Sequence, residues 1–111
     1  MPEKKTIRII RQGDVILWEI PQLPTYAKPV EENDTIGNMN IMPDAVIIHG
    51  ETGHHHVLSG VKVYRTWREV YVVVEKPVTL KHEEHPEVTV PHGVYVVTHV
   101  QDYVMGRRAL D

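Results

Sequence analysis

The chain has 111 residues, 41% hydrophobic and 24% charged, which is typical of a globular protein and excludes a disordered or collagen-like chain. The absence of cysteine excludes a disulfide framework and a thiolate zinc site, so any metal ligands must be nitrogen or oxygen atoms. The net charge of −3 argues against non-specific nucleic-acid binding as the main role. We expect one β domain over residues 1–111. We also expect a cytoplasmic protein, because the chain shows neither a signal peptide nor an apolar run long enough to span a membrane.

Short runs of Val, Ile, Thr and Tyr, separated by Gly, Pro and Asn, predict strands along most of the chain. The expected strands, in chain order, cover residues 6–11, 14–20, 45–49, 54–58, 62–66, 70–75, 78–82, 87–90 and 94–104. So many short strands predict an all-β fold, either a small β-barrel or a β-sandwich.

A long connection at about residues 21–43 contains four of the eight prolines. Loops of this length are uncommon inside compact domains and often form lids or binding loops. A short edge strand at about 35–41 is an equally good interpretation. The sequence therefore leaves open a functional lid or an edge strand here.

Alternation in the last expected strand divides its side chains between two faces. One face suits a core and holds Val94, Val96, Thr98, Val100, Asp102 and Val104. The other face is predicted to line a cavity or to contact another subunit, and it holds Tyr95, Val97, His99, Gln101 and Tyr103.

Glycines bracket a histidine triplet in the stretch GETGHHHV, residues 50–57. On a strand, His54 and His56 project to one face while His55 points away. Two imidazoles on one face are spaced to hold one ion, so His54 and His56 are candidate metal ligands. A solvated turn with incidental histidines is the alternative.

A second cluster, KHEEHP, occupies residues 81–86 between two expected strands. If the segment is extended, His82 and Glu84 share a face; if it turns, His82 and His85 converge. We interpret His82 and His85 as further metal ligands, with Glu83 or Glu84 as general base on a metal-bound water. A polar hairpin tip in solvent is the alternative.

The remaining histidines, His49, His92 and His99, are expected to be structural or exposed. Other catalytic chemistry finds little support, because Ser59 is the only serine and the sequence has no phosphate-binding glycine loop.

Several short motifs together resemble a family of small uncharacterised proteins from bacteria and their phages. These motifs are Gly13-Asp14-Val15, the stretch from Gly50 to His56, His82-Glu83-Glu84-His85, the stretch from Pro91 to Tyr95, and Gln101-Asp102-Tyr103. The resemblance runs nearly end to end. It implies a shared structure and a shared histidine site in the cytoplasm of a bacterium or phage-infected host, without an established activity.

A weaker resemblance is to cupins, small β-barrels with a His-x-His pair in one motif and Pro-x-Gly in another. His54 and His56 match the first motif, and Pro91 and Gly93 match the second. The histidine of the second cupin motif would fall at position 96, where this chain has Val96 instead. A cupin-like barrel would therefore need His82 or His85 in place of the missing ligands.

Two functions follow from these patterns. The first is a histidine-rich protein that binds a divalent transition metal (zinc, iron, manganese or nickel), for which metal-dependent hydrolysis of a small-molecule substrate is the expected reaction. The second is a non-enzymatic binding or structural module that acts as a homo-oligomer. Binding of nucleic acid through basic residues near the termini is the weakest alternative, since the net charge opposes it.

Overall fold

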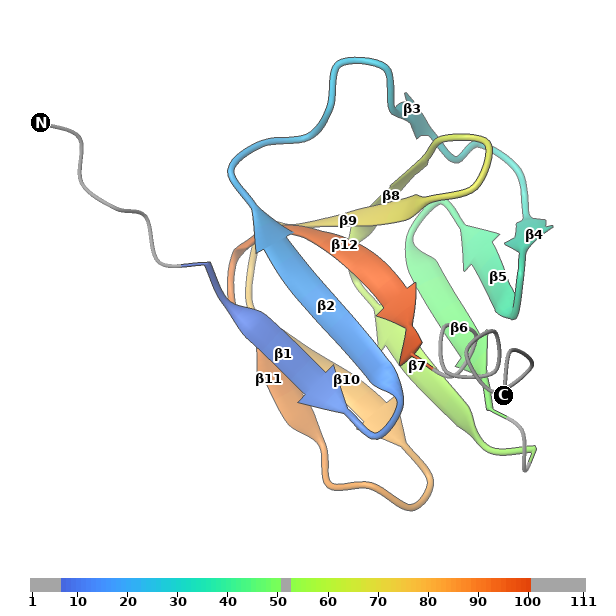
Figure 1. Cartoon of the computed structure of the whole chain (residues 1–111), viewed down its shortest axis with the longest axis vertical. Coiled ribbons are helices and arrows are strands. Elements are labelled where there is room, and N and C mark those ends of the chain that lie inside the picture. The colour runs from blue at the N-terminus through green and yellow to red at the C-terminus, as the bar shows by residue number, and fades with distance from the viewer. Residues whose placement is uncertain (1–6, 51–52, 101–111) are drawn as a thin grey trace, which may run out of the picture.

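The computed structural model describes residues 7–50 and 53–100, which form two six-stranded antiparallel sheets (Figure 1). The first sheet runs in space β1 (Ile9–Gln12), β2 (Val15–Ile20), β12 (Gly93–His99), β9 (Val70–Val74), β8 (Lys62–Arg65) and β3 (Lys28–Pro29). The second runs β11 (Val88–Val90), β10 (Val78–His82), β7 (His55–Ser59), β6 (Ala45–His49), β5 (Met39–Met42) and β4 (Asp34–Ile36).

The all-β prediction is confirmed, and of its two forms the sandwich is the one observed. Each sheet keeps two free edge strands in its order, so neither sheet closes on itself as a barrel. Inward-facing side chains from both sheets form one core, in which Leu17, Ile48, Leu58, Val72 and Leu80 are fully buried. Burial of this apolar surface is the main force that holds the sheets together.

Each of the nine expected strands has a counterpart, but the long connection at about 21–43 carries three further strands, β3, β4 and β5. The β4–β5 hairpin turns at Gly37, whose φ is 57°, and forms an edge of the second sheet. The edge-strand interpretation of this segment is therefore the one observed. A lid over its whole length is not, because Met39 and Ile41 are buried in the core.

The faces of β12 are the reverse of the prediction. Tyr95, Val97 and His99 point into the core and are at most 4% exposed, whereas Val94 and Val96 lie half-buried on the outer face. The side chains of β12 alternate between two faces as predicted, but both faces are apolar enough to be buried. The Tyr95 hydroxyl is accommodated because it donates to the Pro91 carbonyl at 2.8 Å. The rest of that expected strand, residues 101–104, lies outside the described residues.

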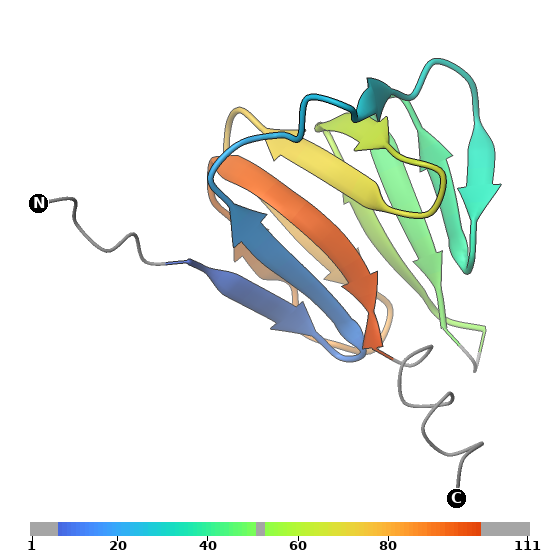
Figure 2. The same ribbon diagram turned by 45° about the horizontal axis from the view of Figure 1, so that its top comes forward.

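Three chain segments meet at one end of the sandwich. They are the β1–β2 turn, the end of β12 and the β10–β11 loop, which lie close together in both ribbon views (Figure 2). The β1–β2 turn needs glycine at position 13, because φ there is 59° and a Cβ would lie 2.5 Å from His85 Nε2. Within the described residues, no helix is long and apolar enough to span a bilayer.

Candidate functional site

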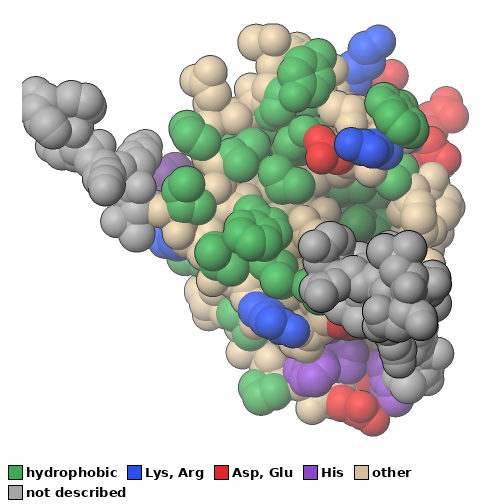
Figure 3. Space-filling model, in the orientation of Figure 1, with side chains coloured by type: hydrophobic (Ala, Val, Ile, Leu, Met, Phe, Trp, Pro, Cys, Tyr) green, Lys and Arg blue, Asp and Glu red, His purple; other side chains and the backbone are tan. Residues whose placement is uncertain are grey.

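The two predicted histidine clusters lie together at this end of the sandwich, where Figure 3 shows histidine side chains beside acidic ones. β7 and β10 are antiparallel neighbours, and their register sets His56 directly opposite His82. The ring centroids of these two residues are 4.3 Å apart, and His85 lies 4.5 Å from His82. His54 lies 5.9 Å from His82, so the four predicted metal ligands form one group, which we call the histidine cluster.

His56 is the buried centre of the histidine cluster, and Gln12 of β1 fixes its ring. The Gln12 amide nitrogen donates to the carbonyls of Leu80 and Pro86, both at 2.9 Å. The Gln12 oxygen is left as an acceptor, so His56 Nδ1 must be the donor in the 2.9 Å contact between them. The proton of a neutral His56 is therefore on Nδ1, and the lone pair is on Nε2.

Asp14 lies between two histidines that come from different sheets. His56 Nε2 is 2.9 Å from Asp14 Oδ1, and His99 Nε2 is 2.9 Å from Asp14 Oδ2. The Asn38 amide nitrogen lies 3.4 Å from His99 Nδ1 and donates to it, so His99 carries its proton on Nε2 and donates that proton to Asp14. His99 thus orients the carboxylate toward His56.

The charges of this group follow from burial and hydrogen bonding. Burial raises the pKa of the Asp14 carboxyl, but the hydrogen-bonding contacts with His99 and His56 outweigh burial and leave that pKa below its ordinary value. Burial lowers the pKa of His56, although Asp14 opposes the effect. Burial and then the neighbouring His85 lower the pKa of His82. Burial therefore disfavours the charged form of His56 and His82, whereas hydrogen bonding favours the charged form of Asp14.

His82 organises the turn that follows β10. Its Nδ1 accepts the backbone N–H groups of Glu84 at 2.9 Å and His85 at 3.1 Å. Of the two conformations left open by the sequence, the turned one is therefore observed, and His82 and His85 converge. Because both amides donate to Nδ1, a neutral His82 carries its proton on Nε2.

The two predicted general bases differ in what they contact. Glu83 Oε1 accepts the backbone N–H of His55 at 2.7 Å, and this hydrogen bond is the main reason that the pKa of Glu83 is lowered. Glu83 thereby ties the β10–β11 loop to the start of β7. Glu84 is exposed and lies 3.2 Å from His54 Nε2. Of the two, Glu84 is the carboxylate whose side chain contacts an imidazole nitrogen.

His99 was expected to be structural or exposed, and it is a buried, structural residue whose hydrogen bond to Asp14 brings it beside the histidine cluster. Gln12 and Asp14 were not identified as site residues at all. The only feature of the sequence that pointed to them was the turn motif Gly13-Asp14-Val15. The position of this motif beside the histidines depends on how the two sheets pack. His49 and His55 lie apart from the site and pack edge-on, with ring centroids 4.5 Å apart.

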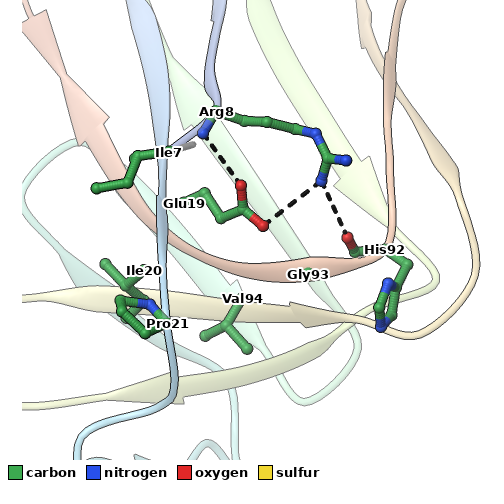
Figure 4. Close-up of a pocket in the computed structure, with 8 residues that line it drawn as sticks. All are labelled: Ile7, Arg8, Glu19, Ile20, Pro21, His92, Gly93 and Val94. Atoms are coloured by element: carbon green, nitrogen blue, oxygen red, sulfur yellow. Dashed lines mark hydrogen bonds and ion pairs between the residues drawn. The ribbon is translucent and has the colours of Figure 1, made fainter. Parts of the chain in front are cut away.

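A hollow of about 440 Å³ lies at the other end of β12, between the N-terminal strand and Gly93 (Figure 4). The Arg8 side chain reaches Glu19 Oε2 and the His92 carbonyl, both at 3.5 Å, so its charge is already satisfied. The Pro91 to Gly93 turn of the cupin-like pattern belongs to this end. It does not meet the histidine cluster.

The ligand geometry of the histidine cluster is incomplete as it stands. Across residues 7–50 and 53–100, no three His, Asp or Glu side chains are already arranged to hold one metal ion. Asp14 contacts two imidazole nitrogens, those of His56 and His99, each at 2.9 Å.

Comparison with known proteins gives a family but no activity. No curated protein and no solved structure matches the chain. A family model described as "Domain of unknown function (DUF8820)" matches residues 11–100, a span that includes every residue of the histidine cluster and all strands except the first two residues of β1. The chain belongs to this family of unknown function.

Proposed function

We propose that the histidine cluster binds a divalent transition metal ion, with His56 Nε2 and the Asp14 carboxylate as its first two ligands. The observation that carries the proposal is the direction of the Gln12 hydrogen bonds. They place the His56 lone pair 2.9 Å from a carboxylate oxygen.

Two lone-pair atoms at that distance repel each other unless a cation lies between them. A proton is one such cation, and a metal ion is the other. An imidazole nitrogen and a carboxylate oxygen together suit zinc, iron, manganese or nickel. A metal-binding histidine usually donates its other ring N–H to an oxygen acceptor, which fixes the ring orientation. His56 donates its Nδ1–H to the Gln12 amide oxygen in this way.

Further ligands would come from His54 and His85, after rotation of their rings toward the His56–Asp14 pair. The His85 ring is stacked nearly parallel to that of His56, with centroids 6.1 Å apart. His85 is exposed, and this rotation would move its ring from its present position against Gly13. His82 is not part of this ligand set. Binding a metal ion through its Nε2 would put the ring proton on Nδ1, which now accepts two backbone hydrogen bonds.

Hydrolysis of a small-molecule substrate is the reaction that this site would support. A metal ion lowers the pKa of a bound water toward neutrality. Glu84, which is exposed and next to His54, would accept the proton of that water as general base. Glu83 would keep its structural contact with the His55 amide.

The test is elemental analysis and calorimetric titration of untagged protein with each of the four metals, alongside Asp14→Asn. An Asn amide at position 14 donates to His56 Nε2 and still accepts from His99, so the fold is retained while the anionic ligand is lost. We expect about one equivalent of metal in the native chain and at least a tenfold loss of affinity in the variant, the usual cost of disturbing a metal site.

His92→Gln is the matched control, because His92 is exposed at the other end of β12. It should bind metal as the native chain does. Equal metal affinity in the native chain, Asp14→Asn and His56→Ala would overturn the proposal.

A second candidate, a homo-oligomeric binding module, is favoured by the outer face of the first sheet. Ile9, Trp18 and Val96 are neighbours in register across three strands, and Ile9 and Trp18 are 56% and 40% exposed. Figure 3 shows hydrophobic side chains across the middle of this face. A second copy would bury the same apolar row against itself. Tyr95 and His99 no longer support this candidate, since both lie in the core.

Light scattering from low to high micromolar concentration tests this candidate, alongside Trp18→Lys. A dimer that the substitution dissociates supports it. A monomer at every concentration rules it out.

A further inference from the structure

Two aromatic side chains at the β3 edge of the first sheet are strongly exposed. Trp67 is 81% exposed and Tyr26 is 69% exposed, more than any other large hydrophobic side chain in the described residues. Together with Lys28, Arg65 and Thr66 they line a hollow of about 400 Å³, which we call the aromatic hollow. Core packing does not account for these rings, so their exposure needs another reason.

The aromatic hollow also concentrates positive charge. Lys28 and Arg65 are directly opposite each other in the β3–β8 pairing, an arrangement of like charges that disfavours a sheet. Asp34 forms an ion pair with Arg65, whereas within residues 7–50 and 53–100 no ion pair forms to Lys28. A third cation, Arg68, lies with its guanidinium carbon 5.3 Å from the Trp67 ring centroid.

Exposed aromatic faces and cations side by side recognise a planar ring that carries negative charge. A base stacks on an aromatic side chain, and Lys and Arg bind its phosphate. The volume of the hollow lies within the range of small-ligand sites. Asp34 and Glu69 nearby, and the net charge of −3, oppose a long polyanion and favour one nucleotide unit.

We propose that the aromatic hollow binds a nucleotide, with the base stacked on Trp67 and Tyr26 and the phosphate held by Lys28, because Asp34 already satisfies the charge of Arg65. The site is independent of the metal proposal. In the first sheet, β3 is the edge strand opposite β1, which carries Gln12 at the histidine cluster.

Once Trp18, the other tryptophan, is replaced, the fluorescence of the protein comes from Trp67 and reports binding at the hollow. In Trp18→Phe, titration with AMP should quench Trp67 fluorescence to saturation. Adenosine and inorganic phosphate alone should each bind at least tenfold more weakly, because each supplies half of the contacts. In the matched variant Trp67→Phe, where Trp18 reports from the outer face, AMP should leave the fluorescence unchanged.

Lys28→Gln in the Trp18→Phe background should weaken AMP about tenfold without changing the thermal unfolding midpoint, since Lys28 is exposed. Calorimetry on Trp67→Ala should show a similar loss. The nucleotide could be a free molecule or part of a nucleic-acid strand, and titration with a short oligoadenylate distinguishes the two. Tighter binding of the oligoadenylate than of AMP supports a nucleotide within a strand. Equal binding supports a free nucleotide. No saturable quench by either probe, or full affinity in Trp67→Ala, would overturn the proposal.

Discussion

The histidine cluster and the aromatic hollow differ in how far their polar groups are satisfied before any ligand arrives. In the histidine cluster, Gln12, Asp14 and His99 lock His56 in a buried network that spans both sheets. In the aromatic hollow, Trp67 and Tyr26 stand in solvent beside a lysine. The first region therefore holds its polar groups in internal hydrogen bonds, whereas the second leaves aromatic surface and a cation exposed. Substitutions in the first should therefore cost stability, and those in the second should cost binding alone.

The largest expected effect is at Gln12. Gln12→Ala leaves the Leu80 and Pro86 carbonyls and His56 Nδ1 without their partner in a buried site. We expect the free energy of unfolding to fall by about 2 to 4 kcal/mol, as measured by urea denaturation. Gln22→Ala, at an exposed position, is the control and should change little. A loss below about 0.5 kcal/mol at Gln12 would mean that the network does not stabilise the fold.

Gly13→Ala should have the next largest effect, and Gly60→Ala is its matched control. Both glycines have positive φ, 59° and 78°, so each substitution costs about 1 to 2 kcal/mol in backbone strain. A Cβ at Gly60 would lie in ordinary contact with Val78 at 3.5 Å, but one at Gly13 would clash with His85. The excess loss in Gly13→Ala over Gly60→Ala, measured by urea denaturation, therefore reports the His85 contact. Equal losses would show that His85 moves away freely.

Lowering the pH should loosen the histidine cluster. Burial holds the pKa of His56 and His82 below the ordinary histidine value of 6.5, at which both titrate in the unfolded chain. Below pH 6.5 the unfolded chain thus binds more protons than the folded one, and stability falls as the pH approaches the folded pKa values. Asp14 stays ionised in this window because its pKa lies below 3.8.

The measurement is the urea midpoint of chelator-treated protein at about pH 7.5 and pH 5.5, where the midpoint should be lower at the acidic pH. His92→Gln should follow the native chain, since His92 is exposed. An unchanged midpoint would contradict the lowered pKa values of His56 and His82.

The smallest effect on stability is expected at the aromatic hollow. Trp67→Ala should change the free energy of unfolding by less than about 0.5 kcal/mol, because the ring is already 81% exposed. Urea denaturation of Trp67→Ala and Gln12→Ala under the same conditions compares the two losses of unfolding free energy directly. A large loss at Trp67 would show that the ring stabilises the β8–β9 turn, and the two regions would then differ less than the structure indicates.

The sequence by itself determined the all-β class and nine of the strands. These follow from local patterns, namely β-branched runs bounded by turn residues. The meeting of the two histidine clusters was a hypothesis, and it depends on the pairing of β7 with β10 across two intervening strands of the other sheet. The turned form of the segment after β10 was among the alternatives.

The tertiary structure alone decided which face of β12 is buried, and that Gln12, Asp14 and His99 join the histidines. Asp14 and His99 are far apart in sequence, and they meet because β2 pairs with β12. Gln12 reaches His56 only because the first sheet packs on the second. Alternation tells which side chains share a face, but when both faces are apolar the packing of the sheets chooses between them. The aromatic hollow likewise exists only because β3 pairs with β8, which brings Lys28 opposite Arg65.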